Sequence, residues 1–390
     1  MNDSSQASQA VPPIRLHHLA ALFARIGATG FGGGMAVVAL MERELIRRRK
    51  LLPLDEFLHG VGLGQVLGSF AVNASLFCGY RLAGWMGALV SAVSFLAPSV
   101  ALVILLSALY FRYHAVPAMQ HAVAGLTPVV VALILAAAWN IGRRVLSSWP
   151  AWPVFAGALV SSLWKANPVW ILLAAGAAGF FFPSPPGGQA RPARSSENQP
   201  ESPQPLLLLA PSGALAGWGL IRLAAVFFHI GLVFFGGGFV LLPVLHAHLV
   251  TRLGWLTPRE FLDGVAISQL TPGPIAVLAT FAGYHLGGVA GALVATAALF
   301  APGIAFMLFL SSQYERHRDQ PWARRFLAGV NPAVAGMILS AAIVLGRGQM
   351  DSWRSLAAAA AAFLLLTAAR LHPAILLAAG AFAGWRGWLP

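Results

Sequence analysis

The chain has 390 residues, of which 58% are hydrophobic and only 9% are charged, and its mean hydropathy is +0.74. A soluble domain carries roughly 25% charged residues, so this composition excludes an ordinary soluble protein and predicts an integral membrane protein. The formal charge of +13 does not indicate nucleic-acid binding, because basic residues of membrane proteins gather in cytoplasmic loops. The single cysteine, Cys78, excludes an intrachain disulfide and a multi-cysteine metal site.

Residues 1–15 form a polar tail, and no cleavable signal peptide is expected because the apolar run after it continues into a full span. The first half then has five apolar stretches that are predicted to be spans, and one broken segment at 57–82. The last two spans are short and must be tilted, paired or only partly exposed to lipid. The five predicted spans are residues 16–41, 85–111, 119–142, 150–164 and 167–183.

The sequence repeats itself at a constant offset of 204 residues, which indicates a duplicated architecture. Phe31-Gly-Gly-Gly34 recurs as Phe235-Gly-Gly-Gly238, and further matches follow without a gap. We therefore predict an all-α polytopic membrane protein of two homologous halves, residues 16–183 and 206–390. Residues 184–205, rich in Pro, Gly, Ser and Gln, are predicted to be a flexible aqueous linker. Later pairs include Gly60 and Gly264, Gln65 and Gln269, Gly79 and Gly283, Tyr80 and Tyr284, and Gly125 and Gly329.

The stretch Gln269–Tyr284 is apolar but contains Thr271-Pro-Gly-Pro274, which a plain spanning helix would not contain. Proline removes a backbone donor and collides with the preceding turn, and hydrocarbon has no water to compensate. We interpret the motif as a break in the helix, placed where protein or a wet cavity satisfies the freed backbone groups. The counterpart Gln65–Tyr80 has Leu67-Gly-Ser69 at the equivalent place, so the two breaks need not contribute equally.

The loop charges favour opposite orientations for the two halves. Residues 43–50 carry five basic side chains, whereas the equivalent loop of the second half has only Arg252 and Arg259. In the next loop the bias reverses, with Arg112 alone against four arginines between 316 and 325. Because basic loops favour the cytoplasm, the halves are predicted to be inverted repeats, each with five spans and a re-entrant helical hairpin. If the broken segment crosses the membrane instead, each half has six spans and the repeats are parallel.

Two repeated features near the ends of the first spans are candidate anion contacts. The glycine clusters Gly32, Gly33, Gly34 and Gly236, Gly237, Gly238 could aim backbone N–H groups at an anion, or could simply allow close helix packing. Arg25 lies deep in the first span, where a charge is expensive and a functional role is the default hypothesis. Seven residues, two helical turns, separate Arg25 from Gly32, which predicts that they share a face. The repeat partner of Arg25 is His229, seven residues before Gly236.

Uncharged donors on the two broken segments can replace the hydration of an anion without holding it irreversibly. They are Gln65, Ser69 and Asn73 in the first half and Gln269, Thr271 and Thr280 in the second. The alternative for each one alone is an ordinary hydrogen bond between helices. Glu56 and Glu260 recur at the entrances of the hairpins and could relay protons, although helix capping and charge balance are the other interpretation. No nucleotide-binding loop, zinc-protease spacing or nucleophile elbow is found, so neither catalysis nor a cofactor or metal is expected.

The combination of these motifs resembles the chromate ion transporter (CHR) family in its long, two-domain form. The resemblance covers nearly the whole chain outside the tail and the linker. In the first half it departs from the family pattern, because Leu67-Gly-Ser69 stands where Pro-Gly-Pro is usual. The motifs that carry it are Phe235-Gly-Gly-Gly238, Trp255-Leu-Thr-Pro-Arg-Glu-Phe261, Gln269-Leu-Thr-Pro-Gly-Pro274, Gly283-Tyr284, Phe31-Gly-Gly-Gly34, Glu42-Arg-Glu-Leu45 and Gly79-Tyr80-Arg81.

The resemblance implies export of chromate from the cytoplasm across a bacterial-type plasma (inner) membrane, with sulfate as the structural analogue, driven by ion gradients or membrane potential. The residues independently suggest an oxyanion at the midplane between the repeats, held by broken helices, Arg25, neutral donors and Pro272, Gly273 and Pro274. Membrane lipids are expected partners, and the sequence is compatible with a homodimer. The alternatives are a sulfate or other anion transporter, a passive anion channel, and a membrane scaffold in which the Gly and Pro motifs only pack helices.

Overall fold

A computed structural model describes most of both halves. The predicted linker 184–205, nearly all of the predicted tail and all of the two glycine motifs except Gly34 lie outside the described residues. The described residues are 14–30, 34–54, 56–57, 60–61, 64, 69–113, 117–146, 149–164, 166, 168–181, 217–233, 241–312, 321–347, 350, 352–369 and 371–389.

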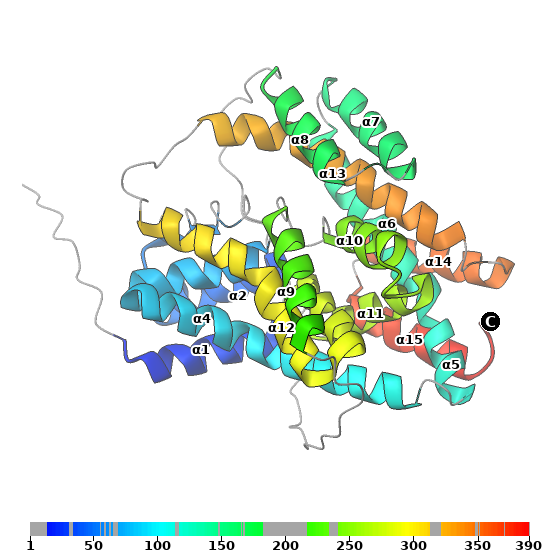
Figure 1. Cartoon of the computed structure of the whole chain (residues 1–390), viewed down its shortest axis with the longest axis horizontal. Coiled ribbons are helices and arrows are strands. Elements are labelled where there is room, and N and C mark those ends of the chain that lie inside the picture. The colour runs from blue at the N-terminus through cyan, green and yellow to red at the C-terminus, as the bar shows by residue number, and fades with distance from the viewer. Residues whose placement is uncertain are drawn as a thin grey trace, which may run out of the picture.

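The described parts of the chain form helices and the turns between them (Figure 1). The two halves contain matching series of elements, because the sequence repeat places the same apolar runs and glycines in each. The first half contains α1 (Leu16–Thr29), α2 (Gly34–Glu42), the π-helix η1 (Arg43–Arg48), α4 (Phe70–Tyr113), α5 (Pro117–Ala124), α6 (Leu126–Val145), α7 (Ala151–Leu163) and α8 (Pro168–Gly179). The second half contains α9 (Gly217–Leu232), α10 (Leu241–Leu245), η3 (His246–Arg252), α11 (Pro258–Leu270), η4 (Ile275–Val277), α12 (Leu278–Ser312), α13 (Pro321–Arg347), α14 (Trp353–Thr367) and α15 (Pro373–Trp385).

The prediction of one continuous first span over 16–41 was wrong. Helix α1 ends at Thr29, Gly30 leaves the helical conformation with ψ 64°, and α2 begins at Gly34. The run of glycines explains the interruption, because glycine has a low helix propensity and no side chain to hold the helix by packing. The first half therefore contains a break after its first helix; the equivalent residues 234–240 of the second half lie outside the described residues.

Helix α4 is a helical hairpin rather than a single rod. Its backbone departs from helical geometry at Ala83 and at Gly84, where φ is 64°. A side chain on Gly79 would collide with the backbone of Gly87, although eight residues of straight helix span about 12 Å. Helix α12 reverses in the same way at Gly287 and Gly288, and Gly283 packs on Gly291. The predicted span 85–111 is thus the long second limb of α4.

A second hairpin precedes this reversal in the second half. A Cβ on Gly264 of α11 would lie 2.5 Å from Phe281 of α12, so α11 and the first limb of α12 lie side by side around Thr271–Pro274. Gly60 and Phe77 make the equivalent contact in the first half. Helix α11 has 13 residues and is about 20 Å long, shorter than a hydrocarbon core of about 30 Å. Whether this hairpin re-enters or crosses the membrane stays a prediction.

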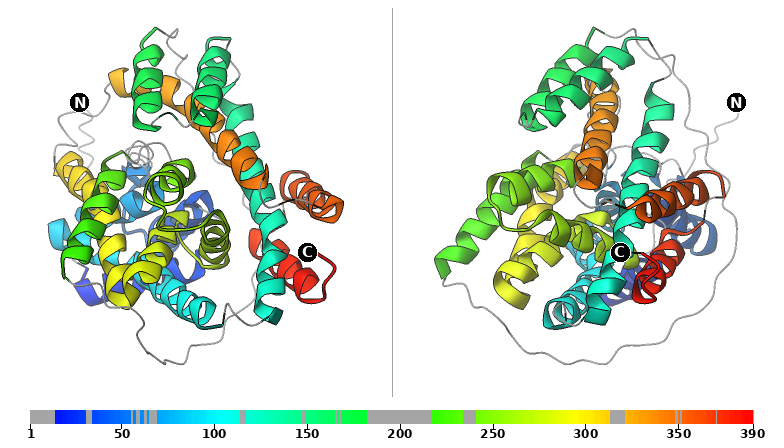
Figure 2. Two further views of the ribbon diagram at one scale, coloured as in Figure 1. Left: turned by 45° about the vertical axis from the view of Figure 1, so that its right-hand side comes forward. Right: turned by 90° about the vertical axis from the view of Figure 1, so that its right-hand side faces the viewer.

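The C-terminal helices of each half pack on the central helix of the other half. Helices α7 and α8 lie against α13, whereas α14 and α15 lie against α6 (Figure 2). Glycines permit the close approach: a side chain on Gly125 would collide with Gly380, and one on Gly329 would collide with Ala175. Because each half places its C-terminal helices on the central helix of the other half, the two halves are intertwined.

Among the described residues, four helices are long and apolar enough to cross a membrane, by length and composition. They are Ala71–Tyr113, Gln120–Arg143, Ile275–Phe309 and Ala328–Arg347, one matching pair in each half. Helix α7 has only 13 residues, yet exposed Trp149 and Trp164 flank its two ends. Tryptophans favour the two interfaces of a bilayer, so short apolar helices of this kind fit a locally thin or tilted crossing.

We expect Gly283→Ala to destabilise the α12 hairpin, because its new methyl group collides with the Gly291 backbone. Overpacking of this kind costs about 1–3 kcal/mol. The measurement is the melting temperature in detergent. Gly157→Ala in α7 is the matched control, since a Cβ there meets nothing within 4 Å; an equal effect of both substitutions would contradict the hairpin packing.

Candidate functional site

The break between α11 and α12 is built by its own sequence. Helix α11 starts with a capping box between Thr257 and Glu260 and ends at Leu270. Pro272 and Pro274 supply no N–H groups, and Gly273 has φ 106°, a conformation that side chains other than glycine rarely adopt. The Thr271 hydroxyl donates to the Ser268 carbonyl at 2.9 Å, which gives a hydrogen-bond partner to one carbonyl at the C-terminal end of α11. The segment 271–274 is hereafter the tip.

The first half of the chain completes the hydrogen bonding of the tip. The Gly273 N–H donates to the carbonyl of Gly30, at the end of α1, with an N–O distance of 3.0 Å. The Ser99 hydroxyl, on the second limb of α4, donates to the Pro272 carbonyl. A Cβ on Gly273 would collide with the Ser99 hydroxyl, so only glycine allows this approach. The predicted break is therefore confirmed as a break that protein, rather than lipid, satisfies.

The equivalent place in the first half holds an unsatisfied polar group. Ser69 lies immediately before α4, is 6% exposed, and its Oγ has no hydrogen-bond partner among the described residues. Its carbonyl accepts from the N–H of buried Asn73 at 3.0 Å. A buried hydroxyl without a partner is costly and rare in proteins. The predicted donor Gln65 lies outside the described residues.

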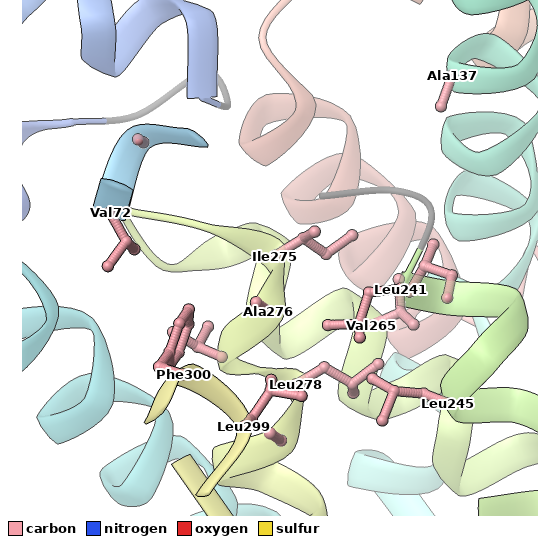
Figure 3. Close-up of a cluster of buried hydrophobic side chains, with 14 of the residues drawn as sticks. Val72, Ala137, Leu241, Leu245, Val265, Ile275, Ala276, Leu278, Leu299 and Phe300 are labelled. Atoms are coloured by element: carbon pink, nitrogen blue, oxygen red, sulfur yellow. The ribbon is translucent and has the colours of Figure 1, made fainter. Parts of the chain in front are cut away.

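Apolar residues that follow three of the breaks meet in one buried cluster. Figure 3 draws Val72, which follows Ser69, together with Ile275 and Ala276, which follow the tip. Leu241, which follows the second glycine cluster, belongs to the same cluster. These four residues are at most 7% exposed, so the positions that follow the breaks lie in dry surroundings where charges and dipoles act strongly.

Arg25 and His229 do not lie on the packed faces of their helices. Arg25 is exposed, whereas Phe23, Ile26 and Gly27 form the side of α1 that contacts α4. Helix α1 ends at Thr29 and Gly32 lies outside the described residues, so the shared face predicted from that spacing stays a prediction. His229 is exposed on α9, with its ring centroid 6.0 Å from that of His248.

The glycine clusters are only partly described. Gly34 begins α2, while Gly32, Gly33, Gly236, Gly237 and Gly238 lie outside the described residues. Gln269 lies near the end of α11 and is partly exposed. Thr280 is buried, with its hydroxyl 2.8 Å from that of Thr296, so it joins the two limbs of α12.

The two recurring glutamates make structural contacts. Glu56 accepts two hydrogen bonds from the Arg81 guanidinium, both at 2.9 Å. Glu260 accepts from the backbone N–H of Thr257 at 2.8 Å and completes the capping box. These contacts agree with the capping and charge-balance interpretation.

Sequence reasoning missed two residues that join the halves. Ser99 gave no signal, because its repeat equivalent is Gly303 and the flanking Ala-Pro pair alone recurs. Asp263 was identifiable as a carboxylate in the apolar run after Phe261. In the structure it is 2% exposed and accepts a hydrogen bond from the Tyr110 hydroxyl of the first half at 2.7 Å.

Comparison with known proteins matches this two-part organisation. The family model described as chromate transporter matches residues 17–180 and again residues 221–385, once in each half. The chain is 30% identical to a probable chromate transport protein of Synechococcus elongatus, over 89% of this chain and 88% of that protein. It is 29% identical to a chromate transport protein of Cupriavidus metallidurans, over 96% and 93% of the two chains.

A shorter relative corresponds to one half. The uncharacterized transporter YwrA of Bacillus subtilis is 30% identical over 41% of this chain and 92% of its own length. No solved structure matches the chain. The double match of the family model and the apolar helices together lead to one conclusion: the chain is a multi-pass membrane protein that belongs to the chromate transporter family.

Proposed function

We propose that the protein is a secondary transporter that exports chromate, or a similar tetrahedral oxyanion such as sulfate, from the cytoplasm across the plasma (inner) membrane. Relatives named as chromate transport proteins support the substrate class. The observation that carries the transport proposal is the tip, a broken helix of one half whose backbone is satisfied by the other half. Such broken helices at a repeat interface form the ion and substrate sites of many secondary transporters, rather than enzyme sites.

We place the oxyanion between the tip and Ser69, the equivalent residue of the first half. Helix α4 begins at Phe70 and η4 begins at Ile275, so each break is followed by a helix N-terminus. Helix N-termini carry free N–H groups and about half a positive charge, which favours an anion. The unpartnered hydroxyl of Ser69 supplies a neutral donor at the same place.

Neutral donors suit transport because the anion must also leave. A dianion in a dry site gains strongly from dipoles and N–H groups, while a cluster of full positive charges would hold it too tightly. Arg25, on an exposed face of α1, is the proposed long-range positive charge. Alternating access would then separate the tip from Gly30 and Ser99 as the halves move.

The proposed transport and the role of the tip are tested together by radiolabelled chromate flux into liposomes that contain purified protein. A coupled carrier saturates and shows counterflow, a channel follows the potential without counterflow, and a scaffold moves nothing. Gly273→Val should abolish flux, because the branched side chain collides with Ser99. Ser69→Val should reduce flux less, since it removes one donor without closing the break.

The control for this comparison is membrane insertion and melting temperature of both variants. Gly254→Ala controls for backbone strain, because Gly254 also has positive φ but a Cβ there meets nothing within 4 Å. Equal, mild effects of Gly273→Val and Ser69→Val would contradict a binding role for the tip.

We expect Arg25→Gln to weaken anion binding while the protein stays inserted and folded. A direct charge-assisted contact is worth about 1.5–3 kcal/mol. The loss of a long-range charge should cost less, so we expect the affinity to fall about tenfold or less. Arg25→Lys should retain part of the transport, because a point charge still attracts the anion. Apparent affinity and melting temperature are measured on the same preparation. Unchanged affinity in a destabilised protein would assign Arg25 a structural role.

The inverted arrangement of the repeats predicts opposite sides for equivalent loops. With Cys78→Ala as background, single cysteines at Arg49, after η1, and at Arg252, at the end of η3, should label from opposite sides of the membrane. The measurement uses a membrane-impermeant thiol reagent on oriented vesicles. Labelling of both positions from one side would overturn inversion and favour six parallel spans per half.

A further inference from the structure

Asp263 ties the two halves together at a second point, away from the tip. It lies in the second turn of α11 and is 2% exposed. The Tyr110 hydroxyl, near the end of α4, donates to its carboxylate at 2.7 Å. Burial of a carboxylate among apolar helices is costly, and an intramembrane ionisable residue is a functional candidate by default. An asparagine would join the same helices without this cost.

A cavity connects this pair to the surface. It has a volume of about 250 Å³ and is lined in part by Tyr110, Asp263, Thr257, Arg259 and Glu260. Thr257 and Arg259 are exposed at its mouth, where the Arg259 guanidinium donates to the Gln120 carbonyl at 3.3 Å. The cavity lining carries the carboxylates of Asp263 and Glu260 but only one guanidinium, that of Arg259. Because negative groups outnumber positive ones, the cavity does not suit an oxyanion. It is large enough to hold water, which can exchange a proton with Asp263.

The Asp263–Tyr110 pair and the tip both join the α11 segment to the second limb of α4. Ser99 and Tyr110 lie three turns apart on the second limb of α4, while Asp263 lies about two turns before the end of the facing helix α11, which the tip follows. The two helices therefore run antiparallel, with two cross-half hydrogen bonds along their contact. About 12 Å of rigid helix separates Asp263 from the tip, so loosening one end changes the constraint on the other.

We propose that Asp263 and Tyr110 form a proton-controlled latch that couples protonation to movement of the tip. This inference rests on the proposed transport function. When Asp263 is ionised, its charge-assisted hydrogen bond from Tyr110 holds α11 against α4. When water in the cavity delivers a proton to the Asp263 carboxylate, Tyr110 keeps its own proton and the remaining neutral bond is weaker. The tip can then leave Gly30 and Ser99.

Several other charged or titratable groups lie near Asp263. Tyr110 faces it from α4, and Arg259 and Glu260 lie in the first turn of its own helix. The His246 ring contacts the Phe261 ring edge-on, and the His285 ring is tilted against the Phe111 ring. Among the described residues, Asp263 is therefore the carboxylate that combines burial, a cross-half partner and access to water.

The test measures chromate flux in liposomes across about pH 5 to 9, the range in which a buried carboxyl group can titrate. Wild-type flux should fall about tenfold per pH unit above its midpoint, where the rate follows the protonated fraction. Asp263→Asn should retain flux but lose the pH dependence. Tyr110→Phe should move the midpoint to higher pH, because the carboxylate loses its donor. Glu42→Gln, which removes a surface ion pair with Arg47, is the control and should match wild type.

Infrared difference spectra on acidification provide a readout that needs no transport. A protonated carboxyl band should appear in wild type and be absent in Asp263→Asn. Wild-type flux without pH dependence, an unchanged pH profile in Asp263→Asn, or no such band would each overturn the latch. If no chromate moves in any sample but the band and its loss are observed, the proposed substrate fails while proton binding by Asp263 stands.

Discussion

The structure depends on satisfying the backbone of a broken helix in apolar surroundings. Hydrocarbon offers no hydrogen bonds, so irregular backbone persists at membrane depth only where protein or enclosed water provides partners. The tip meets this constraint because Gly273 donates to Gly30 and Pro272 accepts from Ser99, while the two prolines have no N–H group to satisfy. The second half therefore cannot complete its own break without the first.

The same dependence recurs throughout the architecture. Helices α7 and α8 cover α13 of the other half, and α14 and α15 cover α6, through glycines that let backbones touch. Contacts of this kind gain from close van der Waals packing, which replaces the hydrophobic effect as the driving force between helices in lipid. The two halves are therefore held together by this packing as well as by the hydrogen bonds of the tip.

Much of this organisation was predictable from the sequence, because duplication and proline chemistry leave direct traces. The 204-residue offset identified the repeat, and Thr271-Pro-Gly-Pro274 identified the break. The interruption of the first span was missed because Arg25 and Gly32 fit helical spacing, although the glycine run disfavours a helix. Ser99 and Tyr110 could not be predicted as partners of α11, because a sequence does not reveal which distant helices lie side by side. The linker, the inverted orientation and the anion contacts stay predictions.

The central claim is that an oxyanion binds where the breaks of the two halves meet. A crystal structure with selenate, a tetrahedral dianion whose selenium atom is located by anomalous scattering, tests it directly. The account predicts a selenium peak beside Ser69 and Gly273, between the N-termini at Phe70 and Ile275. A peak elsewhere in the membrane region, with the tip still bound to Gly30 and Ser99 and no anion beside it, would contradict the account.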